Sequence, residues 1–118
     1  MVEISDEFMR ARLATARAYV VVRLNRGPAY QDSTIRSPEQ AKIVWEHGRR
    51  NMRLHAEGQM ALVGPVAGGG DLVGLCIFTV PENEARTIMD GDGAVQAGVF
   101  VYDVITWFGF PGDGLPPA

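Results

Sequence analysis

Short apolar, β-branched runs alternate along this chain with polar turns and with two longer segments of helical period. The runs are too short for helices and predict strands over 19–24, 59–66, 72–80 and 98–108. Helices are expected over 37–58 and 81–89, and Thr79 and Glu82 have capping-box spacing for the second. Ser37 suits the N-cap of the first and Pro38 its first turn, while Gly58 is a natural terminator.

The two ends of the chain differ from this alternating centre. Residues 5–17 predict a short helix capped by Ser5, with a narrow apolar stripe of Met9, Leu13 and Ala16. We expect this arm to be an extension that lies on the main body. The last ten residues are rich in Gly and Pro and predict no regular structure. The chain therefore divides into an extension over 1–17, a domain over 18–108 and a tail over 109–118.

The order of the central elements, βαββαβ, predicts an α+β fold of the ferredoxin-like kind. Two βαβ units joined by a hairpin give a four-stranded antiparallel sheet with two helices on one face. The 98–108 run is apolar at nearly every position, so we expect it to be covered on both faces. A second copy of the chain is the simplest cover for the remaining face, which predicts a homodimer.

The composition of the chain disfavours several classes of protein. With 118 residues and 47% hydrophobic positions, the chain has the size of one globular domain. A net charge of −3 gives no reason to expect nucleic acid. The single cysteine, Cys76, excludes an internal disulfide and allows a reducing compartment. The acidic first residues are unlike a signal peptide and no apolar run is long enough to span a bilayer, so a cytoplasmic location is expected.

The first central helix has an apolar stripe made of Ala41, Val44, Trp45, Gly48, Met52 and Ala56. Candidate chemistry centres on His47, which flanks this stripe, and on Asp92 in the turn Asp90–Gly93. A lone histidine beside an apolar stripe is most often a partly buried residue bonded to backbone. The functional alternative is a proton-handling pair in which Asp92 fixes the imidazole tautomer. His55 is eight positions from His47 and predicts a surface residue rather than a second metal ligand, so neither a metal nor a cofactor is expected.

Two further residues interrupt the apolar pattern. Arg23 lies within a strand otherwise made of apolar residues and requires an anionic partner. That partner is either structural, within the chain or across a dimer, or it is an acidic or enolate-like substrate. We prefer the structural interpretation. Trp45 is expected in the core or an interface, although an aromatic ring beside His47 also suits a flat substrate.

The interval from His47 to Gly64-Pro65, and that from Asp92 to Gly98-Val99-Phe100, resemble the YCII-related family of dimeric α+β barrels. The resemblance covers about residues 18–108 and implies that His47 and Asp92 are the paired site residues. Candidate substrate contacts are Arg23, Trp45, Gly64 and Pro65. Gly93 departs from the proline usual in this family, which implies a looser turn around the carboxylate. A few relatives in this family act as dehydrochlorinases on chlorinated hydroxyquinones, and neighbouring barrel families include lactone isomerases and polyketide-tailoring enzymes. The resemblance therefore implies a type of pocket rather than a particular substrate.

Two functional hypotheses follow. The first is a small cofactor-free enzyme, a lyase or isomerase, in which the His47–Asp92 pair performs general acid/base chemistry on an aromatic or polyketide-like molecule. The second is a non-catalytic homodimeric ligand-binding or assembly module in which the same pair is structural. A haem- or metal-dependent monooxygenase is disfavoured because its ligand set is lacking.

Overall fold

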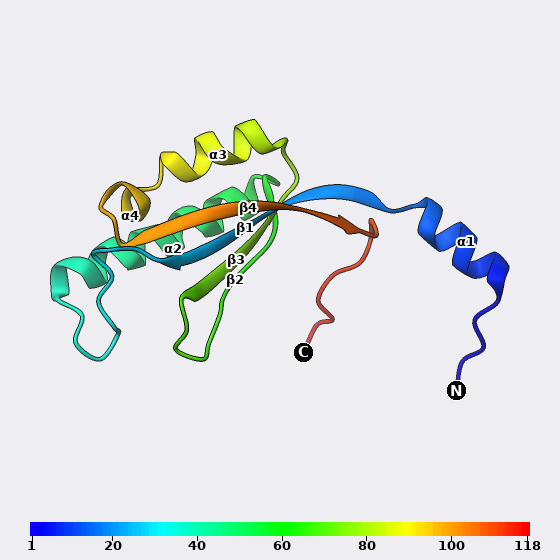
Figure 1. Cartoon of the computed structure of the whole chain (residues 1–118), viewed down its shortest axis with the longest axis horizontal. Helices are drawn as coiled ribbons and strands as arrows, with labels where there is room; N and C mark the ends of the chain where they lie inside the picture. The colour runs from blue at the N-terminus through cyan, green and yellow to red at the C-terminus, as the bar shows by residue number, and fades with distance from the viewer.

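The computed structural model describes all residues 1–118 and contains one four-stranded antiparallel sheet with order β2-β3-β1-β4. The elements are α1 (Asp6–Ala14), β1 (Arg17–Arg26), α2 (Pro38–Ala56), β2 (Met60–Pro65), β3 (Leu72–Phe78), α3 (Glu82–Asp90), α4 (Gly93–Gln96) and β4 (Phe100–Gly109). Helices α2, α3 and α4 lie on one side of the sheet (Figure 1). This arrangement confirms the ferredoxin-like α+β prediction.

The core lies between these helices and one face of the sheet. Side chains that alternate along the two central strands supply the sheet side of this core, because successive residues of a strand point to opposite faces. The buried apolar residues of this core are Val22, Leu24, Leu54, Met60, Cys76, Phe78, Ala85, Met89, Ala94, Val99 and Phe100. Burial of this apolar surface is the main stabilising contribution to the fold.

Strand β1 is longer than the apolar run that predicted it. Its pairing with β4 continues from Arg17 opposite Gly109 to Arg26 opposite Phe100. Polar residues at both ends of β1 are tolerated because the backbone ladder, not side-chain burial, holds them. Gly27 follows directly, and a Cβ there would lie 2.2 Å from the carbonyl oxygen of Gly98, so only glycine fits this crossing of the two strands.

Two details around α3 differ from the sequence expectation. Thr79 does not cap α3, because its hydroxyl donates to the Gly58 carbonyl oxygen at 2.6 Å. The N-cap is Pro81, which has no side-chain capping bond. The turn after α3 also contains a short helix that the sequence did not predict, α4, whose N-cap is Asp92.

Helix α2 buries a different face from the one its apolar residues predicted. Two members of the predicted stripe, Trp45 and Met52, are 69% and 74% exposed. The buried positions are instead Gln40, His47, Asn51 and Leu54. Three of these four are polar, and each has a hydrogen-bonding partner inside the domain. Partners on other elements therefore decided the orientation of this helix.

The N-terminal arm does not lie on the main body, contrary to expectation. Helix α1 stands beyond the far end of β1 and β4 (Figure 1) and has no buried residue. The radius of gyration is 16.9 Å, above the value of about 13–14 Å expected for a compact chain of this length. The apolar stripe of α1 is too narrow for its burial to outweigh the pairing of β1 with β4. This pairing places α1 away from the core. Its tie to the tail is Arg12, which donates to the Asp113 carboxylate.

Removing residues 1–14 is therefore expected to change the free energy of unfolding by no more than about 1 kcal/mol, the scale of an exposed ion pair. Urea unfolding of the full and shortened chains measures this difference. Arg12→Ala in the full chain is the matched control, since it removes the same contact and keeps the helix. A loss comparable to a core truncation would show that α1 is part of the domain.

Candidate active site

His47 and Asp92 lie 45 positions apart in the chain and are hydrogen-bonded in the structure through His47 Nδ1 and Asp92 Oδ2. His47 comes from the middle of α2, and Asp92 from the turn between α3 and α4. The other carboxylate oxygen of Asp92 accepts from the Ala94 backbone N–H at 3.0 Å and so caps α4. Helix capping thus holds the carboxylate in place, and only 1% of Asp92 is exposed.

The second imidazole nitrogen faces another polar group. The Asn51 side-chain nitrogen, one helical turn after His47, lies 3.2 Å from His47 Nε2. With the Nδ1 proton donated to Asp92, Nε2 carries the lone pair and accepts from the Asn51 amide. The ring of Phe100 packs on the imidazole with centroids 4.9 Å apart. The tautomer and plane of His47 are therefore both fixed by neighbours.

The carboxylate of this pair is held in its charged form. Burial alone would raise the pKa of Asp92, but the hydrogen bond and charge of His47 act in the opposite direction. The Ala94 N–H and the nearby Arg50 guanidinium add to this effect, and the net result is a pKa below the ordinary value. Asp92 is thus a stable anion that can balance a positive charge on His47.

A pH dependence of stability follows from this lowered pKa. A carboxyl whose pKa is lower in the folded state contributes stability that is complete above its unfolded value, about 3.9, and that is lost as pH falls below it. The difference in unfolding free energy between the wild type and Asp92→Asn is therefore expected to be constant near pH 5–6 and to shrink below about pH 4. Urea unfolding at pH 3 to 6 measures it. Parallel curves over that range would contradict the expectation.

A cavity of about 550 Å³ lies beside this pair, within the range usual for small-molecule sites. Its walls come from α2, the ends of β1 and β4, the loop after β1 and the β2–β3 hairpin. His47 and Asn51 form part of the wall, as do Gly64 and Pro65 of the predicted substrate contacts. The site is therefore a hollow with one histidine, not an open surface.

The other two predicted substrate contacts do not line this cavity. Arg23 lies on the opposite face of the sheet, where its Nε donates to Asp103 at 2.7 Å. Asp103 is thus the anionic partner that Arg23 required, and its hydrogen bond and charge raise the pKa of Arg23. Trp45 is on the exposed side of α2. The structure brings together His47, Asp92, Gly64 and Pro65, but neither Arg23 nor Trp45 joins them.

Neither a metal site nor a membrane helix is found. No group of three or more His, Cys, Asp or Glu side chains is placed to hold a metal ion. No helix is both long enough and apolar enough to cross a bilayer.

Comparison with known proteins identifies the family of this chain. The family model of the YCII-related domain matches residues 18–108. The chain belongs to the YCII-related family. The match begins at β1 and ends in β4, so it contains both His47 and Asp92, and it confirms the resemblance drawn from the sequence motifs. No curated protein is similar enough in sequence to count as a relative.

A solved structure similar in fold is the 5-chloro-2-hydroxyhydroquinone dehydrochlorinase TftG from Burkholderia phenoliruptrix AC1100, in complex with 2,5-dihydroxybenzoquinone. The TM-score is 0.54 and the sequence identity is 16%. The alignment covers 77% of this chain and 93% of that one. At this identity the likeness shows a shared fold.

Several residues of this YCII-related site were missed by the sequence analysis. Asn51 follows His47 by four positions, and this spacing places two side chains on one helix face. The contact between Asn51 and His47 could therefore have been predicted from the sequence. Phe100 belongs to the family motif but was not expected beside the imidazole, and the cavity residues Arg26, Tyr30 and Arg36 gave no local signal. They lie in a loop and at strand ends whose neighbours are set by the fold.

Cys76 also lines the cavity, yet it is expected to be unreactive. Burial, with a smaller effect of the Asp92 charge, raises the pKa of its thiol to about 12. The nucleophile is the thiolate, which is scarce at pH 8 under these conditions. Labelling of the folded protein with 5,5′-dithiobis(2-nitrobenzoate) at pH 8 should be much slower than labelling of the urea-unfolded chain. Equal rates would show that the thiol is open and ionised.

Proposed function

We propose that this chain is a small cofactor-free enzyme in which His47 acts as general base and acid on a ring-type small molecule bound in the cavity. The observation that carries the proposal is the imidazole held at Nδ1 by a buried carboxylate, in the wall of a cavity of ligand size. Such a pair fixes the tautomer, so Nε2 is the atom that exchanges a proton with the ligand.

The neighbours of the pair suit this role. When Nε2 takes a proton, the imidazolium is stabilised by the Asp92 anion across the Nδ1 bond. The Asn51 amide then has to present its oxygen, since Nε2 has become a donor. That oxygen is buried and has no partner in the present state. A turn of the Asn51 amide thus gives each protonation state of His47 a complementary partner.

Among reactions of this class, we favour elimination from an aromatic or quinone-like ring. In such a step the ring reacts as a keto tautomer, in which the carbon that bears the leaving group and its neighbour are both saturated. His47 takes a proton from the neighbouring carbon, the electrons of the broken C–H bond form the new C=C bond, and the leaving group departs with its bonding pair. The support is that TftG, similar in fold, is a dehydrochlorinase of a chlorinated hydroxyhydroquinone. Isomerisation begins with the same proton removal and is the nearest related outcome.

The test follows ring C–H exchange of 2,5-dihydroxybenzoquinone in D₂O by proton NMR, and chloride release from 5-chloro-2-hydroxyhydroquinone. The wild type is expected to accelerate at least one of these reactions above the buffer rate. No acceleration of either one at millimolar ligand would reject the proposed activity on quinone-like rings.

A second candidate, a non-catalytic module with a structural pair, is favoured by one observation. Both imidazole nitrogens already have partners within the chain, and only 9% of His47 is exposed. If the pair is structural, His47→Gln should lower the melting temperature by several degrees and leave ligand chemistry unchanged. The enzyme hypothesis predicts the opposite pattern.

We also propose that the protein is a homodimer. The sheet face without helices exposes several large apolar side chains between 38% and 46%: Leu75, Val101, Ile105 and Trp107. An exposed apolar face of this kind favours contact with a second copy, and the ion pair of Arg23 with Asp103 separates Leu75 on β3 from the apolar residues of β4. Sedimentation velocity should give twice the mass of the 12.8 kDa chain, and a monomer at tens of micromolar would reject the proposal.

A further inference from the structure

The cavity has a second polar end that the proton-transfer proposal does not use. Arg26 and Arg36 both line it, and Tyr30 lies between their elements in the same wall. The guanidinium carbon of Arg26 is 4.8 Å from the centre of the Tyr30 ring, and that of Arg36 is 5.4 Å from it. Two cations thus share one aromatic ring, an arrangement in which each is oriented by the ring face.

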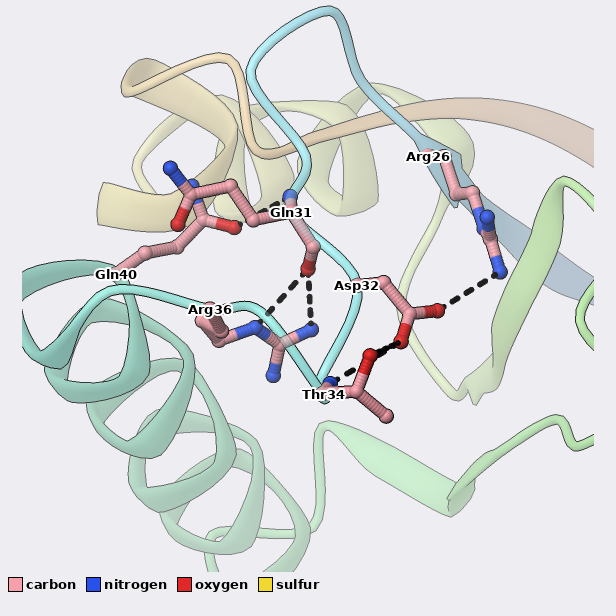
Figure 2. A network of polar contacts seen from close by, with 6 residues as sticks. All are labelled: Arg26, Gln31, Asp32, Thr34, Arg36 and Gln40. Atoms are coloured by element: carbon pink, nitrogen blue, oxygen red, sulfur yellow. Dashed lines mark hydrogen bonds and ion pairs between the residues drawn. The ribbon is translucent and has the colours of Figure 1, made fainter.

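The donors of Arg26 are largely uncommitted. Its contact with Asp32 is 4.0 Å long, at the limit of an ion pair, and its buried Nε has no hydrogen-bond partner. Figure 2 shows Arg26 reaching from the end of β1 toward Asp32. Since a guanidinium presents five donors, this group has the capacity to bind an anionic oxygen group from a ligand.

Arg36 is held in position by backbone rather than by a carboxylate. Its Nε and Nη2 donate to the Gln31 carbonyl oxygen at 3.2 and 3.1 Å (Figure 2). A carbonyl oxygen orients the guanidinium without neutralising its charge. With Asp32 as the single carboxylate of the cavity wall beside two arginines, this end of the cavity has an excess of one positive charge. The chain as a whole has a net charge of −3, so the excess is local.

The loop that carries these groups is tied down before any ligand arrives. The Gln31 backbone N–H donates to the Gln40 side-chain oxygen at 2.7 Å, and the Gln40 amide donates to the Ala29 carbonyl oxygen at 2.9 Å. Gln40 is a buried residue of α2, the helix that carries His47. The loop of the cationic end is therefore hydrogen-bonded to the helix that carries the histidine, which favours a preformed site.

Aromatic rings connect the two ends. Phe100 has its centroid 4.9 Å from His47 and 6.1 Å from Tyr30, both within ring-contact range. The Phe100 ring thus lies between the imidazole and the Tyr30 ring, which both guanidinium groups contact.

We infer that Arg26 and Arg36, with Tyr30, form an anion subsite, and that the substrate of this site is a planar ring carrying a carboxylate. This inference rests on the proposed function only for the identity of the cavity as the substrate site. The carboxylate is the group that matches the two-pronged guanidinium fork. The opposite end of the ring then lies toward His47, where the proton is moved.

The test compares two ligands of the same ring and similar shape, 2,5-dihydroxybenzoate and 2,5-dihydroxybenzamide, by isothermal titration calorimetry at pH 7. The carboxylate carries a negative charge and the amide is neutral, with an NH2 donor in place of one oxygen. The wild type is expected to bind the acid about 10- to 100-fold more tightly than the amide, the scale of one charge-assisted hydrogen bond. Arg26→Met keeps the apolar stem on Tyr30 and should bring this ratio close to one while leaving amide binding unchanged. Arg36→Met is the second variant and should also lower the ratio.

Three controls separate the causes. Asp32→Asn keeps the oxygen that accepts from Thr34 and removes a competing anion, so acid binding should tighten. Arg49→Met removes an arginine outside the cavity and should leave the ratio unchanged. His47→Gln should keep the ratio as well, because the charge preference does not depend on proton transfer.

The outcomes distinguish this inference from the proposed function. Equal binding of acid and amide by the wild type, a ratio unaffected by Arg26→Met in a folded protein, or binding of neither ligand at millimolar concentration would each overturn the anion subsite. A preserved ratio without any ring-proton exchange by the wild type would instead sustain the subsite and reject the acid/base activity.

Discussion

His47→Gln is expected to lower the rate of ring-proton exchange about 10²- to 10⁴-fold, the usual contribution of one general acid/base group. The amide side chain of glutamine remains polar and can bond to Asp92, but it has no lone-pair nitrogen that takes a proton at neutral pH. The fold should persist, because the cavity wall keeps a polar side chain of similar reach. The loss should appear in kcat at saturating ligand, since Nε2 acts on the proton in transit.

The chain supplies its own control for this experiment. It contains two histidines, and the other, His55, is an exposed residue of the same helix whose Nδ1 lies 2.8 Å from the Met60 carbonyl oxygen. His55→Gln should leave the exchange rate within about twofold of the wild type, as expected for a surface change away from the cavity. If both variants retain the wild-type rate, His47 is not the base. If both lose it, the loss reflects α2 and not the imidazole.

Asp92→Ala is expected to have the largest effect on stability, a loss of about 3–5 kcal/mol, because it removes one partner of a buried hydrogen-bonded pair. The change removes the side-chain acceptor for Ala94 and the partner of His47 Nδ1 at once. It also leaves Arg50 without the nearby anion, although Arg50 Nη1 already lacks a partner. The buried imidazole then faces an empty, uncharged space.

Asp92→Asn is the matched variant, since its amide oxygen can still cap α4 while the negative charge is lost. Its stability loss should be smaller, about 1–2 kcal/mol, the cost of weakening one buried hydrogen bond. Exchange activity should nevertheless fall as far as in Asp92→Ala, because an amide cannot balance an imidazolium. Chemical unfolding measures the stability of the two variants, and the exchange assay measures their activity. Equal stability losses would mean that charge, rather than capping, holds the turn.

The sequence was enough to predict that His47 and Asp92 form a pair, but it did not predict most of the residues that surround them. His47 and Asp92 were found because their motif spacing resembles that of the YCII-related family, and the structure joins them by a hydrogen bond. The roles of both residues stay predictions until activity is measured. Asn51 was within reach of the same reasoning, since its spacing from His47 is helical.

The polar stripe on α2 shows why the orientation of a helix is hard to predict from composition. An apolar stripe normally marks the buried face, yet Trp45 and Met52 are exposed and Gln40 and Asn51 are buried. Burial of these amides is compensated by partners from the loop after β1 and from the imidazole. Such compensation exists only once the loop and the helix have come together.

The sequence by itself determined the order of the major helices and strands and the antiparallel ferredoxin-like sheet. These features follow from local hydrophobic period and turn chemistry, which neighbouring residues carry. The tertiary structure alone decided which face of α2 is buried, that Asp103 pairs with Arg23, and that Arg26 and Arg36 meet at the cavity. Those choices depend on contacts between distant segments, and a carboxylate or guanidinium has no preferred partner until the chain has folded.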